Sequence, residues 1–263
     1  WTRILNIPFW ALFNMLPIIL YKDLHASALQ VTLMIALKPL SAIAASYWSI
    51  SIHSHPEKIV SNLVWANILR FLPFLFIPWI DSSWFMVLGF GIYMMFWRGV
   101  IPAWMEALKR HVPNQSREGT FSYGSALYYL GTAMIPVLFG WVLDEYFQSW
   151  RWIFPVTAVI GMASTFFLMQ IPTENLKEEK ELPPPASPFL LRPWQESWKL
   201  LRERWDFAQF QIGFMLGATG LMLMQPALPM FFVDVLQLSY MKMQLAIAVC
   251  KGIGYAASSP VWV

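Results

Sequence analysis

Four cationic side chains lie within otherwise apolar segments of this chain, at Lys38, Arg70, Arg98 and Lys251. None of the 15 Asp and Glu residues lies as deep, because all of them fall in polar stretches or near segment ends. A cation inside hydrocarbon costs at least about 2.5–3.5 kcal/mol, so each one needs a counter-group, water or an anionic ligand. Ammonium and guanidinium groups bind carboxylates and phosphates, so the pattern favours recognition of an anionic or zwitterionic solute.

Each arginine also has a structural interpretation. Arg98 can contact a solute or pair with a structural partner such as Glu106, two helical turns further along. Arg70 follows Asn67 by one turn, and pairing with that amide or snorkelling toward the interface is favoured over ligand contact. The carboxylates nearest to a segment interior are those of Glu106 and Asp234, which we expect to be solvated at helix ends.

Polar side chains in the same apolar segments extend the candidate site. Such groups either line a cavity or hydrogen-bond neighbouring helices, and the residues alone do not separate these roles. The candidate solute-binding set comprises Arg98, Lys38, Lys251, Asn14, Tyr123, Tyr128 and Gln225.

The composition defines the medium in which these groups must be held. With 57% apolar residues, 13% charged residues and a mean hydropathy of +0.50, the chain is expected to be an all-α polytopic membrane protein. Segments of the length needed to cross a bilayer are predicted at 4–21, 31–50, 59–80, 84–108, 121–143, 152–171, 207–233 and from 241 onward. The segment 207–233 should kink at Pro226 and Pro229, and 84–108 is long enough to tilt or kink.

Lysine and arginine counts predict the orientation of the chain in the membrane. Ten lie on one side, at Lys58, Lys109, Arg110, Arg117, Lys177, Lys180, Arg192, Lys199, Arg202 and Arg204, and three on the other, at Lys22, Arg151 and Lys242. Cytoplasmic loops carry the excess of basic residues, so the N-terminus and the connector before 207 should be cytoplasmic. A plasma or bacterial inner membrane is the expected location.

The chain divides into a six-helix bundle at 1–171, a connector at 172–206, and the first two helices of a second bundle at 207–263. The stretch 174–188 is charged and proline-rich, which predicts an extended linker. Trp194, Trp198, Leu201 and Trp205 then recur at helical spacing among cations. They predict a helix in the membrane interface, or equally one packed against helix ends. The chain lacks an initiator Met and its last segment still runs at Val263, so we expect a fragment.

Residues 16–46 resemble residues 228–258 without a gap, at an offset of 212. Leu-Pro recurs as Leu16-Pro17 and Leu228-Pro229, and Lys38 and Lys251 occupy adjacent positions of this alignment. For both lysines, ligand contact and a structural role remain open. Parallel repeats of six helices are the plan of one large class of secondary transporters.

Several motifs resemble the major facilitator superfamily. Trp150 to Pro155 reads WRWIFP at the entry to a span, and Arg117 with Gly119 resembles the family's cytoplasmic 4/5 loop. Gly131, Pro136 and Gly140 match three positions of a glycine-proline motif in which Ile135 and Phe139 replace two glycines. We expect these small residues to serve close helix packing before any role in exchange.

This resemblance implies a twelve-helix protein, of which the chain covers eight helices. It implies secondary active transport of a small solute by alternating access, with a lipid bilayer and a solute as partners. It also implies that the span 84–108, which carries Arg98, lines a cavity, and that 59–80, which carries Arg70, is peripheral. The coupling ion stays open: exchange, facilitated diffusion and coupling through helices outside this sequence are all compatible.

Other features limit the possible functions. Residues 49–58 read SISIHSHPEK in place of the family's charged 2/3 loop, and we expect His53 and His55 to be solvated before any role as a pH sensor or metal pair. Cys250 is the only cysteine and no Walker A loop is present, so no cofactor, metal, ATP or nucleic acid is expected. A solute sensor on a transporter scaffold is the main alternative, and a membrane-embedded enzyme is disfavoured.

Overall fold

The computed structural model describes residues 2–54, 58–111, 114–171 and 191–258. Within the helices it leaves the side chains of 44–46, 49–54, 109–111, 114–123, 192–193 and 254–258 undescribed. The described part of the chain is helical and contains no strand. His53, His55, Tyr123, Arg117, Gly119 and the linker 174–188 therefore lie outside the described side chains or residues.

A helix lies in each of the eight predicted segments. The first bundle comprises α1 (Thr2–Leu5), α2 (Ile7–Lys22), α3 (Ala28–Ser54), α4 (Ile59–Leu75), the 3₁₀ turn η2 (Ile77–Trp79), α5 (Ser83–His111), α6 (Asn114–Glu145), α7 (Trp150–Ala163) and α8 (Thr165–Met169). After α9 (Arg192–Glu203) come α10 (Trp205–Met224), α11 (Ala227–Met230), the π-helical turn η4 (Phe231–Val235) and α12 (Tyr240–Ser258). The largest boundary error is at α6, which begins at Asn114 although its apolar run begins at 121.

Within the described residues, six segments have the length and hydropathy to cross a membrane: Thr2–Lys22, Ile59–Trp79, Ser83–Leu108, Gly124–Glu145, Trp150–Met169 and Trp205–Val235. The other two predicted spans correspond to α3 and α12. In α3 the described apolar stretch, Ala28–Ile43, is shorter than the rest, and α12 does not meet the same criterion over its described residues.

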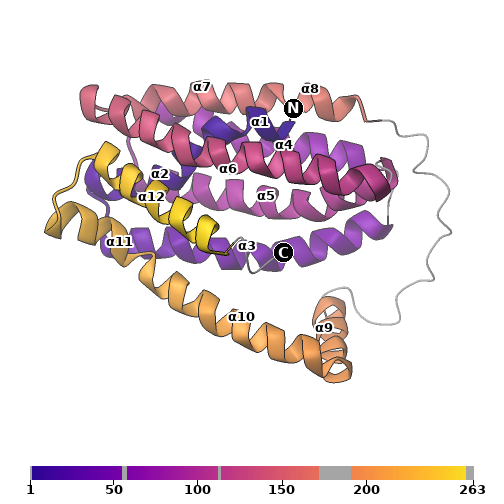
Figure 1. Cartoon of the computed structure of the whole chain (residues 1–263). Helices are drawn as coiled ribbons and strands as arrows, with labels where there is room; N and C mark the ends of the chain where they lie inside the picture. Colours follow the sequence, from indigo (N-terminus) through magenta and orange to yellow (C-terminus); the bar gives the residue numbers. More distant parts are fainter. Residues whose placement is uncertain (1, 55–57, 112–113, 172–190, 259–263) are drawn as a thin grey trace.

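Helix α2 runs through the middle of the first bundle, with the other helices around it (Figure 1). Its aromatic side chains form the centre of the core. Phe9 meets Phe71 edge-on at 4.7 Å between ring centroids, and Phe13 stacks on Phe90 at 4.5 Å. Edge-on and offset pairs add about 0.5–1.5 kcal/mol each beyond their buried area. The bundle is therefore held by ring packing around one central helix.

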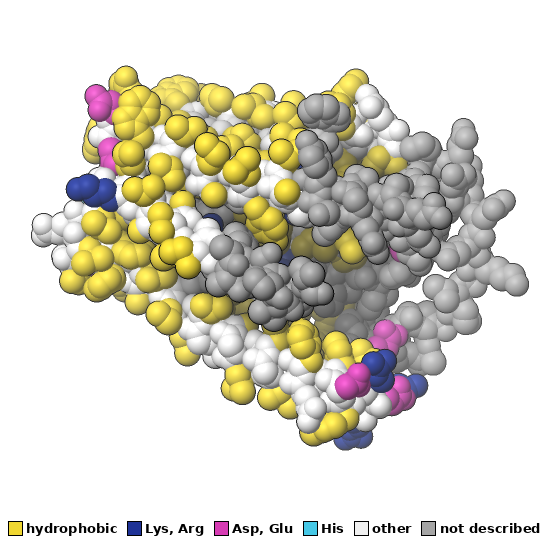
Figure 2. Space-filling view, in the orientation of Figure 1, with side chains coloured by type: hydrophobic (Ala, Val, Ile, Leu, Met, Phe, Trp, Pro, Cys, Tyr) yellow, Lys and Arg dark blue, Asp and Glu magenta, His cyan; other side chains and the backbone are white. Residues whose placement is uncertain are grey.

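The surface has the character expected of a protein in lipid. Hydrophobic side chains cover much of the described part of the visible face, and most of its visible charged side chains lie toward the two ends (Figure 2). On α10 even large apolar side chains such as Phe210 and Leu223 are exposed. Exposed apolar surface of this extent belongs in hydrocarbon or against further apolar helices.

The predicted kink in the segment 207–233 is confirmed. Helix α10 stops at Met224, Pro226 precedes α11, and Pro229 lies within it. Proline has no N–H, so the carbonyls of Met222 and Gln225, four residues before each proline, lose their usual helix donors. The break therefore exposes backbone acceptors inside a membrane-spanning segment.

The internal repeat is confirmed at the level of the backbone. His25 and Gln237, which are 212 residues apart, both have a φ of 48°. The amide of Leu24 donates to the carbonyl of Ile19, and at the same offset that of Leu236 donates to Phe231. Helices α3 and α12 also begin at equivalent positions. The two stretches thus fold as one recurring helix, turn and helix.

Candidate functional site

Lys38 and Gln225, two of the predicted site residues, meet across the two halves of the molecule. The Nζ of Lys38 in α3 donates to the Oε1 of Gln225, at the end of α10, over 3.0 Å. The same ammonium lies 6.0 Å from the ring centroid of Phe90 on α5. Both side chains are partly buried. The contact therefore places a cation beside the broken helix.

This contact lies well inside the membrane-spanning part. Lys38 follows the start of α3 by ten residues, and Gln225 precedes the end of η4 by ten. At 1.5 Å per residue each lies about 15 Å from that end of its segment, which is half of a hydrocarbon core about 30 Å thick. Broken helices at the midplane expose backbone groups that can coordinate a solute or ion.

Asn14 and Arg98 flank a stack of two tryptophans. The side chain of Asn14 is exposed although most of α2 is buried, and its Nδ2 donates to the Trp10 carbonyl over 2.7 Å. Trp10 stacks on Trp97 of α5 at 4.9 Å between ring centroids. The guanidinium of Arg98 lies 5.2 Å from the Trp97 ring, and its Nε is buried with no hydrogen-bond partner among the described residues. Because this N–H group has no partner, Arg98 can still donate a hydrogen bond to an anionic ligand.

Tyr128 of α6 hydrogen-bonds the side chain of Trp10, so it reaches the same tryptophan stack and also contacts Arg3. The guanidinium of Arg3 in α1 lies 4.7 Å from the Tyr128 ring, and its Nη1 donates to Ser125 Oγ over 3.3 Å. Sequence reasoning missed Arg3 because it precedes the first predicted span. A basic residue just before a span would predict lipid phosphate contact, whereas the structure turns Arg3 onto α6.

The remaining candidates do not join the Lys38 contact. Lys251 is exposed on α12, so the adjacent repeat positions of the two lysines do not give them a shared environment. The side chain of Tyr123 is outside the described part of the chain. Of the predicted set, the structure therefore brings together Lys38 with Gln225, and places Arg98 and Tyr128 beside the stacked Trp10 and Trp97.

Arg70 belongs to a buried polar cluster inside the first bundle. Its guanidinium donates to the Oδ1 of Asn67, which confirms the predicted pairing. The Nδ2 of Asn67 in turn donates to Thr165 Oγ1 over 2.7 Å and to Ser164 Oγ over 3.2 Å. The Arg70 cation also lies 4.7 Å from the Phe71 ring centroid. This network joins α4 to the break between α7 and α8, which is a structural role.

The glycines of α6 allow close approach at two places. A Cβ on Gly131 would lie 2.8 Å from the side chain of Ile7, and one on Gly140 would lie 2.8 Å from the Cα of Met241 in α12. Pro136 between them is buried. The first contact is within the first bundle, whereas the second is a backbone contact between the two halves.

Three aspartates near the ends of their segments make contacts that sequence reasoning missed. Asp23, Asp144 and Asp234 all accept hydrogen bonds from residues more than 90 positions away. Asp234 is exposed, in keeping with the expected solvation, and it also accepts the phenol of Tyr21. A helix-end carboxylate is usually solvated, so only its position beside another segment reveals this role.

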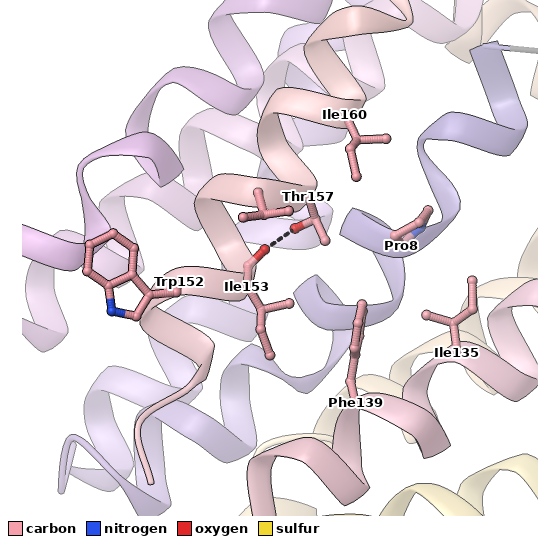
Figure 3. A pocket seen from close by; sticks show the side chains of 8 residues that line it. Pro8, Ile135, Phe139, Trp152, Ile153, Thr157 and Ile160 are labelled. Atoms are coloured by element: carbon pink, nitrogen blue, oxygen red, sulfur yellow. Dashed lines mark hydrogen bonds between the residues drawn. The ribbon is translucent and has the colours of Figure 1, made fainter. Parts of the chain in front are cut away.

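An apolar groove lies on the outer surface between α2, α6 and α7. Its wall includes Phe139, Trp152 and Ile153 (Figure 3). The hydroxyl of Thr157, which also belongs to the wall, donates to the Ile153 carbonyl over 2.7 Å. The lining of the groove contains no charged side chain to bind an ionic solute, and its apolar surface suits a lipid chain.

A bundle of apolar helices, a repeated pair of helices and a span broken beside a partly buried cation characterise a multi-pass integral membrane protein. The family model described as Major Facilitator Superfamily matches residues 4–262, and the chain belongs to that family. No curated protein matches the chain. Membership implies a secondary transporter, with the bilayer and a solute as partners, in a family that is typically non-enzymatic.

Proposed function

We propose that this protein moves an anionic or zwitterionic solute by alternating access, with Lys38 at the solute site. The observation that carries the proposal is the contact of 3.0 Å between the Lys38 ammonium and the Gln225 amide oxygen at the helix break. It joins the first bundle (1–171) to the unit that follows the connector (172–206), which begins at 207. A site between two moving bodies is what alternating access requires.

The Lys38 contact leaves its positive charge uncompensated. An amide oxygen satisfies one donor of the ammonium but supplies no negative charge, and the described residues form no ion pair with Lys38. A carboxylate or phosphate entering the site would add the missing charge and make a charge-assisted hydrogen bond. The exposed Asn14 amide and the unpartnered Nε of Arg98 are further groups that such a solute can use.

The proposed orientation follows from the basic residues and from α9. Trp194 and Trp198 are exposed on this helix, and Trp194 Nε1 donates to Tyr47 Oη of α3 over 3.0 Å. The cation of Arg202 lies 5.1 Å from the Trp198 ring. We propose that α9 lies in the cytoplasmic interface, anchored to α3, with its tryptophans in the lipid headgroup region.

Uptake by the complete protein in proteoliposomes tests the solute class. The panel comprises anionic, zwitterionic and neutral metabolites, with Lys38→Gln, Lys38→Arg and a matched surface variant, Lys58→Gln, at an exposed lysine. We expect uptake of a charged solute that Lys38→Gln impairs, Lys38→Arg partly restores and Lys58→Gln leaves intact. Uptake of neutral solutes alone, unaffected by Lys38→Gln, would overturn the proposal.

Binding without flux would favour the sensor alternative. A ligand that binds only the folded state stabilises it by about 2.7 kcal/mol at a hundredfold excess over Kd. Thermal stability in detergent against the same panel therefore detects binding, and the proteoliposomes detect movement. Stabilisation by a solute that is never taken up would identify a receptor on a transporter scaffold.

A further inference from the structure

The end of the molecule opposite the connector is closed by side chains of both halves. There the end of α2, the end of α6 and the start of α12 lie together, at left in Figure 1. The positive-inside prediction makes this the non-cytoplasmic end. We refer to Gly140, Asp144, Asp23, Tyr240, Tyr21 and Asp234 as the latch.

Asp144 caps the first turn of α12 from another helix. Its Oδ1 accepts the backbone N–H of Tyr240 over 2.8 Å, and its Oδ2 accepts that of Met241 over 2.9 Å. The first N–H groups of a helix have no partner within the helix, and a carboxylate there also benefits from the helix dipole. Asp144 belongs to α6, so the cap joins two helices that must separate if this end opens.

Helix α12 is capped by a side chain of another helix, whereas α3 is capped by its own first turn. In α3, Ser27 Oγ accepts the Gln30 N–H over 3.3 Å, and Gln30 Oε1 accepts the Ser27 N–H over 2.9 Å. This is a reciprocal capping box. At the equivalent positions α12 has Ser239 and Lys242, and a lysine has no acceptor to return. Asp144 instead accepts the next two N–H groups of this turn, those of Tyr240 and Met241.

Gly140 lies one turn before Asp144 on the same helix, and together they form a socket for the start of α12. A Cβ on Gly140 would lie 2.9 Å from the Met241 backbone N and 3.0 Å from the Tyr240 carbonyl carbon. These are backbone atoms, which cannot rotate away as a side chain can. A methyl group at 140 would therefore push α12 off α6 and lengthen both bonds to Asp144.

Asp23 holds the same turn of α12 from α2. Its Oδ1 accepts the phenol of Tyr240 over 2.8 Å, and its Oδ2 accepts the indole N–H of Trp150 over 2.7 Å. The ammonium of Lys22 lies 4.2 Å from the Tyr240 ring centroid. On the other side of the turn, Tyr21 donates to Asp234. Tyr240 is buried, although it begins a helix at the edge of the molecule.

We infer that the latch forms and breaks during transport. While it is formed, a solute cannot reach the site at Lys38 from the non-cytoplasmic end. All of its contacts between the halves converge on one turn of α12 and on the preceding η4. Loss of these bonds would release the first turn of α12 from Asp23 at the end of α2 and from Asp144 of α6. The inference rests on the proposed function only for the idea that access alternates between the two ends.

The first test is hydrogen exchange of the complete protein, which needs no solute. Asp144→Asn and Gly140→Ala should speed amide exchange in the peptide 238–245 by about fivefold to tenfold, the change in open population expected for loss of a helix cap. Glu145→Gln and Gly124→Ala are matched controls, because Glu145 is exposed and a Cβ on Gly124 meets nothing within 4 Å. Unchanged exchange in both latch variants would overturn the inference. Slow exchange in the buried part of α2 must persist, which excludes global unfolding.

The second test is access to the interior from outside. In a Cys250→Ser background, Asn14→Cys places a thiol on the exposed position of α2, about 12 Å from Lys22 along the helix axis. A membrane-impermeant maleimide added from the non-cytoplasmic side should label it slowly, and about fivefold to tenfold faster after Asp144→Asn. Faster exchange in α12 without faster labelling would overturn the inference, because it would show a helix cap that does not close the path. Neither readout depends on the solute class, so this inference can fail while the proposed function stands.

Discussion

The two repeat units, 16–46 and 228–258, have the same backbone but are held in different ways. Both turn at a left-handed residue, His25 or Gln237, and both place a serine before the second helix. The first unit completes its cap internally with Gln30, whereas the second has Lys242 there and uses Asp144 of another helix. The turn at His25 is therefore stabilised within its own segment, whereas the turn at Gln237 depends on a contact with another helix, and that contact can separate.

Burial shows the same contrast. In the span Thr2–Lys22, 61% of the most hydrophobic window is buried inside the protein, against 6% in Trp205–Val235. Leu16 is fully buried in the first bundle, whereas its repeat equivalent Leu228 is 38% exposed. The first unit therefore begins in the core of the bundle, whereas the second is held mainly through the packing of α12 on α6 and through the latch.

The largest expected effect comes from truncating the equivalent leucines. Leu16→Ala should lower the free energy of unfolding by about 2–5 kcal/mol, because it leaves a cavity in a packed core. Leu228→Ala should cost roughly 1 kcal/mol or less, as at other exposed positions. Thermal unfolding in one detergent compares the two variants. Equal losses would show that the second unit is packed as tightly as the first.

Neutralising the two repeat lysines separates the solute site from the exposed surface. Lys38→Gln should raise the solute concentration for half-maximal uptake by about 10- to 100-fold, the loss expected for a hydrogen bond to a charged group. Lys251→Gln should change it by less than about threefold, because Lys251 is exposed and lacks the Gln225 contact. Similar losses at both positions would indicate that the lysines act as a symmetric pair.

Removing the internal cap tests whether the first turn is self-sufficient. Gln30→Ala should lower the free energy of unfolding by about 1–2 kcal/mol, because the Ser27 N–H loses its acceptor. The bond of 2.7 Å from Gln30 Nε2 to Ser83 Oγ is lost with it. Lys242→Ala, the matched change in the second unit, should have almost no effect on thermal unfolding.

Giving the second unit the cap of the first is the smallest and sharpest change. Lys242→Gln recreates the Ser-x-x-Gln box at 239–242 and should stabilise the first turn of α12 by a few tenths to about 1 kcal/mol. Combined with Asp144→Asn, it should reduce the rise in hydrogen exchange that Asp144→Asn causes alone. Additive effects of the two substitutions would mean that the internal cap and Asp144 do not share one role.

Much of the fold follows from local patterns. Apolar runs locate a helix in each predicted segment, and Pro226 with Pro229 marks the break in the segment 207–233. The pairing of Arg70 with Asn67 follows from their spacing on one helix face. Helix ends in polar sequence are less predictable, as the early start of α6 at Asn114 shows, because charged residues continue a helix without an apolar run.

The candidate site is only partly readable from the sequence. The cost of a cation in lipid marks four residues equally, Lys38, Arg70, Arg98 and Lys251, and does not say which of them belong to a solute site. The contact of Lys38 with Gln225 spans 187 positions, and no local pattern carries such a distance. The latch is hidden for the same reason, since Asp23, Asp144 and Asp234 each read as an ordinary carboxylate at the end of a span.

By itself the sequence determined the medium, the helices, the internal repeat and the family resemblance. These depend on hydropathy, spacing and proline, which act within a few residues of the chain or recur along it. Only the tertiary structure decided which cation meets the broken helix, and that Asp144 caps a helix 96 positions away. The physical reason is that hydrogen bonds and close packing act over about 3–4 Å, so partners remote in sequence are set by how the helices pack.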